Sequence, residues 1–338
     1  MLDIIEHLPD GLLETEASDL HIILPRPTLI HLPGRRQPAL FVSILLHGNE
    51  DAGLKAIQTV LRKYRNHELP RALSIFVGNV DAARAGLRRL DGQPDFNRIW
   101  PGTEHAAGEE TDMARTVLEE MRRRGVFASI DIHNNTGLNP HYGCINRLDP
   151  AFLHLAALFS RIAVYFLRPR GVQSLAFSEI CPALTIECGK AGNSEGEAHA
   201  ASLLEACLHL SAFPTHAVAP HDLDLFHTVG TVKVAEHISF TFGADDADLR
   251  FDPALDHMNF RELAAGTPLG STRMPSIPLQ VIDESGQEVT SRYFEVRQGR
   301  LITRCEVMPS MLTLDERVIR QDCLCYLMER YPHPDVLN

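Results

Sequence analysis

The sequence predicts an α/β protein with a doubly wound, mainly parallel sheet and a β-rich C-terminal domain. Three apolar runs, 39–46, 128–133 and 183–187, support the sheet, because each is short, rich in apolar residues and typical of a buried parallel strand. Segments with helical spacing of apolar residues lie between these runs. Strands that alternate with helices favour a parallel sheet with helices on both faces.

The other elements of the first part follow from the same periodicities. We expect a helix over 51–64, whose acidic first turn suits the helix dipole, and a strand over 73–77. Residues 78–112 contain Gly, Pro and Asp and show little periodicity, and loops of that length in a compact domain usually carry function. Further helices are predicted over 113–124, 150–162 and 195–210, and a further strand over 164–167.

A change of composition near Ala212-Phe213-Pro214 predicts two domains, over 1–212 and 213–338. Beyond that point, residues 229–235 alternate as a strand does. Residues 279–303 predict paired short strands around turns at 284–286 and 298–299. The second domain is therefore expected to be rich in β-structure.

Polar side chains stand at the ends of the three apolar runs. His47 and Glu50 follow the first run, and His133 and Glu187 end the other two. Ligands of open α/β sheets bind at the carboxyl ends of the strands, so these side chains are expected to meet. Two His and one Glu form a known catalytic zinc set with one position left for water. We expect His47, Glu50 and His133 to bind one zinc ion per chain, which leaves Glu187 as the base.

The order of these motifs resembles the zinc carboxypeptidase-like deacylases, represented by succinylglutamate desuccinylase and aspartoacylase. The family pattern is H-x-x-E, D-[LF]-N-R, D-x-H and E-x-G. This chain has His47-Gly48-Asn49-Glu50, Asp95-Phe96-Asn97-Arg98, Asp131-Ile132-His133 and Glu187-Cys188-Gly189 in that order. The resemblance is good over about residues 39–200 and weaker over 229–270. It implies a zinc carboxypeptidase-like fold with a C-terminal domain that narrows the catalytic mouth.

The resemblance also implies a reaction, the hydrolysis of the amide bond of a small N-acyl amino acid. Glu187 would act as general base and acid, and Asn97 and Arg98 would hold the carboxylate of the amino-acid half. A guanidinium fork matches a carboxylate bidentately, which supports Arg98 on physical grounds as well. Arg88, preferred slightly to Arg89, would polarise the scissile carbonyl and stabilise the oxyanion.

Departures from the family pattern concern the acyl group. Where aspartoacylase has an Arg for the acyl carboxylate, this chain has Phe177, which removes one anion clamp. Arg168 and Arg170 either supply a replacement charge or belong to a solvated loop. Tyr293 either reaches the site, as a tyrosine of the family's C-terminal domain does, or is an aromatic residue on a strand face. The motifs do not settle which acyl group is removed.

Composition excludes some classes of partner. A net charge of -12 argues against nucleic acid, whose phosphates are bound by clustered Lys and Arg. No run reaches the roughly 20 apolar residues of a membrane helix, and the N-terminus shows no basic export signal, so we expect a cytoplasmic protein with no membrane partner. The seven Cys predict reduced thiols. Homo-oligomers stay open, as do two other functions: a zinc carboxypeptidase and a catalytically silent metal-binding module.

Overall fold

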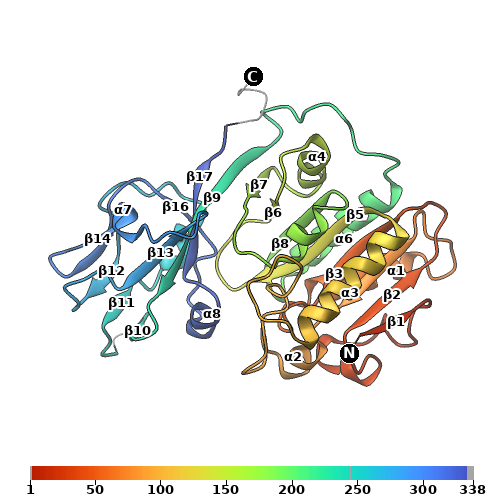
Figure 1. Cartoon of the computed structure of the whole chain (residues 1–338), viewed down its shortest axis with the longest axis horizontal. Coiled ribbons are helices and arrows are strands. Elements are labelled where there is room, and N and C mark those ends of the chain that lie inside the picture. The colour runs from red at the N-terminus through yellow and green to blue at the C-terminus, as the bar shows by residue number, and fades with distance from the viewer. Residues whose placement is uncertain (1, 244, 333–338) are drawn as a thin grey trace. The chain divides into compact units, whose positions relative to one another are not determined.

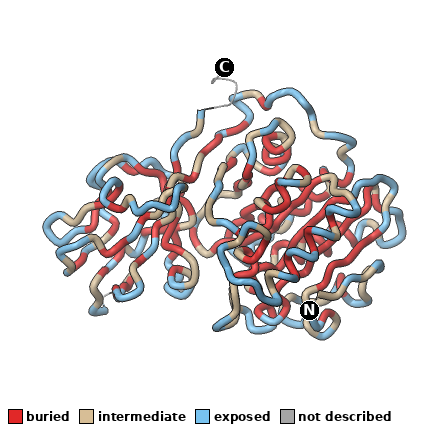
Figure 2. Tube along the Cα trace, viewed as in Figure 1, coloured by how far each residue is buried: buried red, intermediate tan, exposed pale blue. Residues whose placement is uncertain are grey.

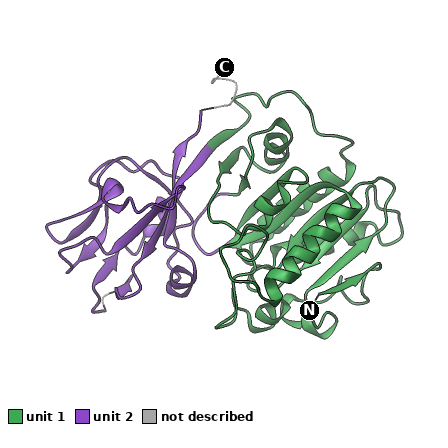
Figure 3. Cartoon of the chain, in the orientation of Figure 1, with its two compact units in different colours: residues 1–134, 141–225, 333–338 green, residues 135–140, 226–332 purple. Residues whose placement is uncertain are grey.

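The computed structural model describes residues 2–243 and 245–332, which form two compact units (Figure 1, Figure 3). Unit 1 contains the described residues of 1–134 and 141–225, and unit 2 contains those of 135–140 and 226–332. The short segment 135–140 therefore interrupts unit 1 along the chain. Each unit is described by itself below.

The strands of unit 1 form one sheet. Its order is β1 (Asp3–Ile5), β2 (Thr28–Leu32), β4 (Leu73–Val77), β3 (Ala39–Ile44), β5 (Val126–Asn135), β8 (Ala183–Lys190), β6 (Tyr142–Ile145) and β7 (Ile162–Tyr165). β3 runs parallel to both β4 and β5, as the sequence predicts. β2 is antiparallel to β4 and β6 is antiparallel to β8, so the sheet is mixed near its sides.

Helices cover both faces of this sheet. Gly53 of α1 (Ala52–Lys63) lies against Ile44, whose side chain points to one face. His31 of β2 and Phe41 of β3 both pair with Ser74 of β4, so their side chains point to the same face, opposite to that of Ile44. The ring of His31 lies 4.0 Å from Glu120 of α3 (Glu109–Arg124). The two helices therefore lie on opposite faces, and the predicted doubly wound α/β fold is confirmed. The other helices of unit 1 are η1 (Ala17–Ile22), α2 (Val80–Ala85), α4 (Pro150–Phe159), α5 (Gln173–Phe177) and α6 (Ser194–His209).

The core of unit 1 follows its central strands. Every residue of β2, β3 and β4 is buried, and Figure 2 shows these strands in red between the helices. Strands covered on both faces are nearly continuously apolar, which explains why the sequence shows unbroken runs there. Each fully buried aliphatic side chain contributes about 1.5–3 kcal/mol of hydrophobic stabilisation. The sheet is thus a rigid base for the loops at its edge.

Some predicted boundaries in unit 1 need correction. The stretch 78–112 contains a short helix, α2, because Asn79 accepts a hydrogen bond from the Ala82 amide and Gly86 ends the helix at φ 62°. The helix predicted over 150–162 ends at Phe159 and the next strand begins at Ile162. Ser160 causes this break, since its hydroxyl accepts from the Ile162 amide and donates to the carbonyl of His141.

Unit 2 is rich in β-structure, as predicted for the C-terminal region. β9 (Asp224–Val234) pairs with β17 (Cys325–Arg330) and β13 (Leu279–Asp283), and β17 also pairs with β16 (Met308–Ser310). A second sheet has the order β10 (Phe240–Thr241), β11 (Leu249–Phe251), β12 (Pro268–Thr272), β15 (Arg300–Thr303) and β14 (Phe294–Arg297). The elements η2 (Leu255–Met258), α7 (Thr290–Tyr293) and α8 (Glu316–Gln321) complete the unit.

Both predicted turns of unit 2 reverse the chain. The turn at 298–299 joins β14 to β15. After the turn at 284–286, Glu288 pairs back with Ile282 of β13 through a single antiparallel bridge, and β13 also pairs along its length with β9. Asp283 holds the latter turn by accepting from the amides of Ser285 and Gln287. Tyr293 is buried in the hydrophobic core of unit 2, so its ring packs within that unit.

Two observations concern the described part of the chain as a whole. All seven cysteines are free thiols, as predicted. Among the described helices, none combines the length and the apolar composition that crossing a bilayer requires.

The loop after β3 packs tightly against α2. A Cβ added to Gly48 would lie 2.1 Å from the amide nitrogen of Ala83, which is hydrogen-bonded within the helix and cannot move aside. We expect Gly48→Ala to lower the free energy of unfolding by about 1–3 kcal/mol, measured by urea denaturation of the metal-free protein. Gly108→Ala is the matched control, because its Cβ would meet its nearest neighbour at 3.8 Å, and a loss equal to that of Gly48→Ala would contradict this account.

Candidate metal centre

Three buried side chains meet at the carboxyl end of β3 and β5. His47 and Glu50 lie on the loop between β3 and α1, and His133 lies near the end of β5. The chain can turn away from the sheet here because Leu45 has a φ of 53°. One donor atom from each of the three residues lies within 4.8 Å of the others. The structure thus brings together the three side chains that the sequence indicates as metal ligands.

The donor atoms lie close enough together for one zinc ion to bind them. Glu50 Oε1 lies 2.8 Å from His47 Nδ1, Glu50 Oε2 lies 2.7 Å from His133 Nδ1, and the two Nδ1 atoms are 3.2 Å apart. Ligand atoms of tetrahedral zinc, at bond lengths of about 2.0–2.1 Å, lie about 3.3 Å apart, so the two nitrogens match this spacing and the carboxylate oxygens lie about 0.5 Å closer to them. The donor set of two imidazoles and one carboxylate also has the chemistry that zinc prefers, so the residues fit the ion.

A second layer of carboxylates fixes the two imidazoles. His47 Nε2 lies 2.9 Å from Asp95 Oδ1, and His133 Nε2 lies 2.7 Å from Asp131 Oδ2. A metal-binding His commonly donates its other N–H to a carboxylate, which sets its tautomer and its orientation. Ser43 in turn donates a 2.6 Å hydrogen bond to Asp131 Oδ1. Both Nδ1 atoms are therefore left to face Glu50.

The charges of the centre shift the pKa values of its groups. Burial lowers the pKa of His133, but Asp131 and Glu50 outweigh it and hold the pKa well above its ordinary value. Burial and Arg88 lower the pKa of His47, whereas Glu50 and Asp95 raise it and prevail. Burial raises the pKa of Glu50, but the two imidazoles hold it far below its usual range. The metal-free centre is consequently an ionised cluster, whose carboxylates favour the protonated form of both imidazoles.

Arg88 lies beside the three metal-ligating candidates, and Arg89 does not. Arg88 Nη2 donates to Asp95 Oδ2 at 2.9 Å, and Arg88 Nη1 lies 3.4 Å from Glu50 Oε1. Arg89 instead donates to the carbonyl of Gln93 at 2.7 Å. Of the two arginines, Arg88 is therefore the one in contact with a metal-ligating candidate.

Asn97 and Arg98 lie on the loop beneath His133. The side-chain nitrogen of Asn97 lies 3.3 Å from Asp131 Oδ2 and 3.2 Å from His133 Nε2, while its side-chain oxygen accepts from the backbone N–H of Gln173. Asn97 therefore orders the layer behind the imidazole. Arg98 is half-buried and donates to the carbonyl of Asn97 at 2.8 Å.

Glu187 is buried on β8, the neighbour of β5 in the sheet. The backbone N–H of Ser129 on β5 donates to the carbonyl of Pro182, just before β8. With the same register continued along both strands, Glu187 is opposite His133 and its side chain points to the same face. Asn134 joins the strand ends by donating its amide to the Gly189 carbonyl at 3.0 Å. The predicted base thus lies beside the strand that carries a predicted metal ligand.

Phe177 does not contribute to the surface of the site. Its ring is fully buried and stacks on Phe41 with centroids 4.3 Å apart. Arg168 pairs with Glu104 at 3.0 Å, and Arg170 is exposed on the same loop. These contacts agree with the interpretation of a solvated loop.

The supporting residues Ser43, Asp95 and Asp131 were not predicted as functional positions. Asp95 and Asp131 belong to the D-F-N-R and D-I-H motifs, so their place in those motifs is the signal that points to them. Ser43 is a polar residue within an apolar strand, and its burial opposite Asp131 explains why it occurs there.

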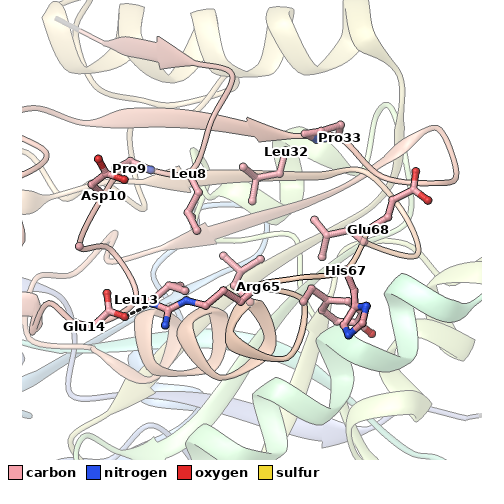
Figure 4. Close-up of a pocket in the computed structure, with 14 residues that line it drawn as sticks. Leu8, Pro9, Asp10, Leu13, Glu14, Leu32, Pro33, Arg65, His67 and Glu68 are labelled. Atoms are coloured by element: carbon pink, nitrogen blue, oxygen red, sulfur yellow. Dashed lines mark hydrogen bonds and ion pairs between the residues drawn. The ribbon is translucent and has the colours of Figure 1, made fainter.

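A separate hollow of about 440 Å³ lies elsewhere on unit 1 (Figure 4). It is lined by Leu32 at the end of β2, by Tyr64 and Arg65 after α1, and by the N-terminal segment around Leu13. The residues of the metal centre do not line it. Arg65 forms an ion pair with Glu14 there, and Asp10 and Glu68 add further carboxylates to the lining.

Comparisons with known proteins agree with this geometry. Residues 36–213 match the family model described as the Succinylglutamate desuccinylase/Aspartoacylase catalytic domain. The succinylglutamate desuccinylase of Burkholderia lata is 29% identical over 124 residues, which are 36% of this chain and 32% of that protein. That of Burkholderia pseudomallei is 29% identical over 138 residues, 37% of this chain and 35% of the relative. The matches thus span about a third of the length of these relatives.

Solved structures resemble the chain over most of its length. The succinylglutamate desuccinylase of Chromobacterium violaceum has a TM-score of 0.57 and 18% identity, and the alignment covers 89% of this chain and 87% of that one. Murine aminoacylase 3 has a TM-score of 0.55 and 18% identity, with 88% and 97% covered. These likenesses show a shared fold. Since the family model covers more than half of the 338 residues, the chain belongs to the succinylglutamate desuccinylase/aspartoacylase family.

Proposed function

We propose that this protein hydrolyses the amide bond of a small N-acyl amino acid with the help of one zinc ion. The observation that carries the proposal is the convergence of His47 Nδ1, Glu50 and His133 Nδ1, with the other nitrogen of each imidazole held by a carboxylate. Membership of a desuccinylase/aspartoacylase family supports this substrate class. The succinylglutamate desuccinylases that match part of the chain point the same way.

The metal, held by His47, Glu50 and His133, would supply Lewis acidity and lower the pKa of water. The chain's own residues would do the rest. Glu187 would take a proton from the attacking water and later deliver it to the departing amine. Arg88 would donate to the oxygen of the acyl carbonyl as negative charge develops there.

Arg98 is our candidate for the carboxylate of the amino-acid half. Its guanidinium is half-buried on the loop beside the centre and can bind a carboxylate bidentately. Asn97, whose side chain contacts Asp131 and His133, would support this binding by fixing the loop. The pair would thus orient the substrate while Glu187 and Arg88 act on the amide.

Two other functions use the same residues. A zinc carboxypeptidase would share the ligands and the base, and it would release a C-terminal amino acid from a small peptide. A silent metal-binding module would keep the ligands without needing a base, so a Glu187 buried on the strand next to that of His133 favours an enzyme.

A substrate panel with metal removal tests the proposed function. We expect release of free amine from N-succinyl, N-acetyl or N-formyl amino acids, loss of that activity on chelation and its return when zinc is added. His133→Ala should bind zinc weakly and lose activity, because it removes one of three ligands. Activity that survives chelation would refute the zinc mechanism, and cleavage of peptides alone would favour the carboxypeptidase.

Replacement of the base separates catalysis from metal binding. We expect Glu187→Gln to lower kcat by about 10²–10⁴-fold, because proton transfer is lost while the three ligands stay in place. Zinc content measured by competition with a chromogenic chelator should be unchanged. Glu179→Gln, an exposed site in the same unit, is the control and should keep full activity. Undiminished turnover in Glu187→Gln would rule out this role.

Metal affinity should depend on pH. The raised pKa values of His47 and His133 mean that the metal-free imidazoles hold their protons to higher pH than ordinary histidines do, and zinc must displace these protons. We expect zinc affinity to rise between about pH 6 and about pH 8, and binding to release protons. Calorimetry in two buffers of different ionisation enthalpy measures the protons released. Affinity that does not change with pH would contradict the ionised cluster.

A further inference from the structure

Of the two aspartates that support the imidazoles, Asp95 is the one that also contacts Arg88. Its Oδ1 faces His47 Nε2 at 2.9 Å and accepts from the backbone N–H of Asn97 at 2.7 Å, and its Oδ2 accepts from Arg88 Nη2 at 2.9 Å. The side chain is buried, so these contacts are little screened by solvent. One carboxylate therefore contacts both the imidazole of His47 and the guanidinium of Arg88.

Asp131 provides a natural comparison. It contacts His133 Nε2 at 2.7 Å, and its other described partners are the Ser43 hydroxyl and the side-chain amide of Asn97. Both aspartates are buried and both support one imidazole through Nε2. They differ in that only Asp95 binds Arg88 in the described structure.

We propose that Asp95 is a positioning residue that couples metal binding to the placement of Arg88. The expected effect of Asp95 on turnover rests on the proposed function, whereas its expected effect on metal binding rests on the geometry alone. Asp95 holds His47 with Nδ1 toward the metal position, and it holds Arg88 at a fixed distance from Glu50.

The position of Arg88 explains why Asp95 would affect metal affinity. Its Nη1 already lies 3.4 Å from Glu50 Oε1, a ligand oxygen, while its Nη2 is drawn toward Asp95. Without the Asp95 charge, the guanidinium would move toward Glu50 and compete with the metal for that carboxylate. Asp95 thus keeps a necessary cation from weakening a metal ligand.

The test is a comparison of two isosteric variants in two backgrounds. Zinc affinity is measured by chelator competition for Asp95→Asn and Asp131→Asn, each alone and combined with Arg88→Ala. We expect Asp131→Asn to weaken zinc binding by about 10–100-fold through its imidazole. Asp95→Asn should weaken it further, and this excess should disappear in the Arg88→Ala background, because the competing guanidinium is gone.

Turnover at saturating zinc gives a second readout. We expect Asp95→Asn to lower kcat by about 10²-fold through the displaced Arg88, with a small change of KM, whereas Asp131→Asn keeps most of its kcat. Adding Asp95→Asn to Arg88→Ala should lower kcat little further. Thermal unfolding of each metal-free variant shows whether it folds, and Asp95→Ser replaces Asp95→Asn if that variant does not.

Two results would overturn the proposal: equal effects of Asp95→Asn and Asp131→Asn on both readouts, or an excess loss of zinc affinity that persists in the Arg88→Ala background. If the unaltered protein hydrolyses no N-acyl amino acid, the proposed function fails. The zinc measurements still decide the role of Asp95 in that case, because they require no substrate.

Discussion

The site depends on one constraint: three donor atoms of two imidazoles and a carboxylate must converge at the end of two neighbouring strands. Burying such polar and charged groups together costs free energy unless each group contacts a partner of opposite charge or a metal. Asp95 and Asp131 supply such partners to the imidazoles on the side away from the donor atoms, and Arg88 lies beside Glu50. Much of the polar interior of unit 1 can be understood as the support that this convergence requires.

The support is built from elements that have little else in common. Ser43 belongs to β3, Asp131 to β5, and Asp95 and Asn97 to the long loop after α2, yet they form one connected set of hydrogen bonds. A network of this kind stabilises a single arrangement when each member has its partners. The rigid sheet fixes the strand residues, and the network extends that rigidity to the loop.

The sequence allowed the fold class and the three metal-ligating candidates to be predicted, because buried parallel strands leave unbroken apolar runs and ligands follow such runs directly. Boundaries were harder to predict. Helix α2 lacks a long periodic pattern and depends on one capping side chain, Asn79, while the pairing of β13 with β9 joins segments far apart in the chain. The support by Asp95 could not be predicted either, since hydrogen bonds between distant segments depend on side-chain geometry that spacing does not encode.

The interruption of unit 1 by residues 135–140 matters for dissecting the protein. This segment follows Asn134 directly and belongs to unit 2, where Gly137 packs so closely that a Cβ there would lie 1.8 Å from the Leu312 carbonyl oxygen. A shortened chain that stops at residue 213, where the family match ends, would therefore retain a loop whose packing partner is missing. That loop begins two positions after His133. The limits of the sequence match are consequently not the limits of an independently folding piece.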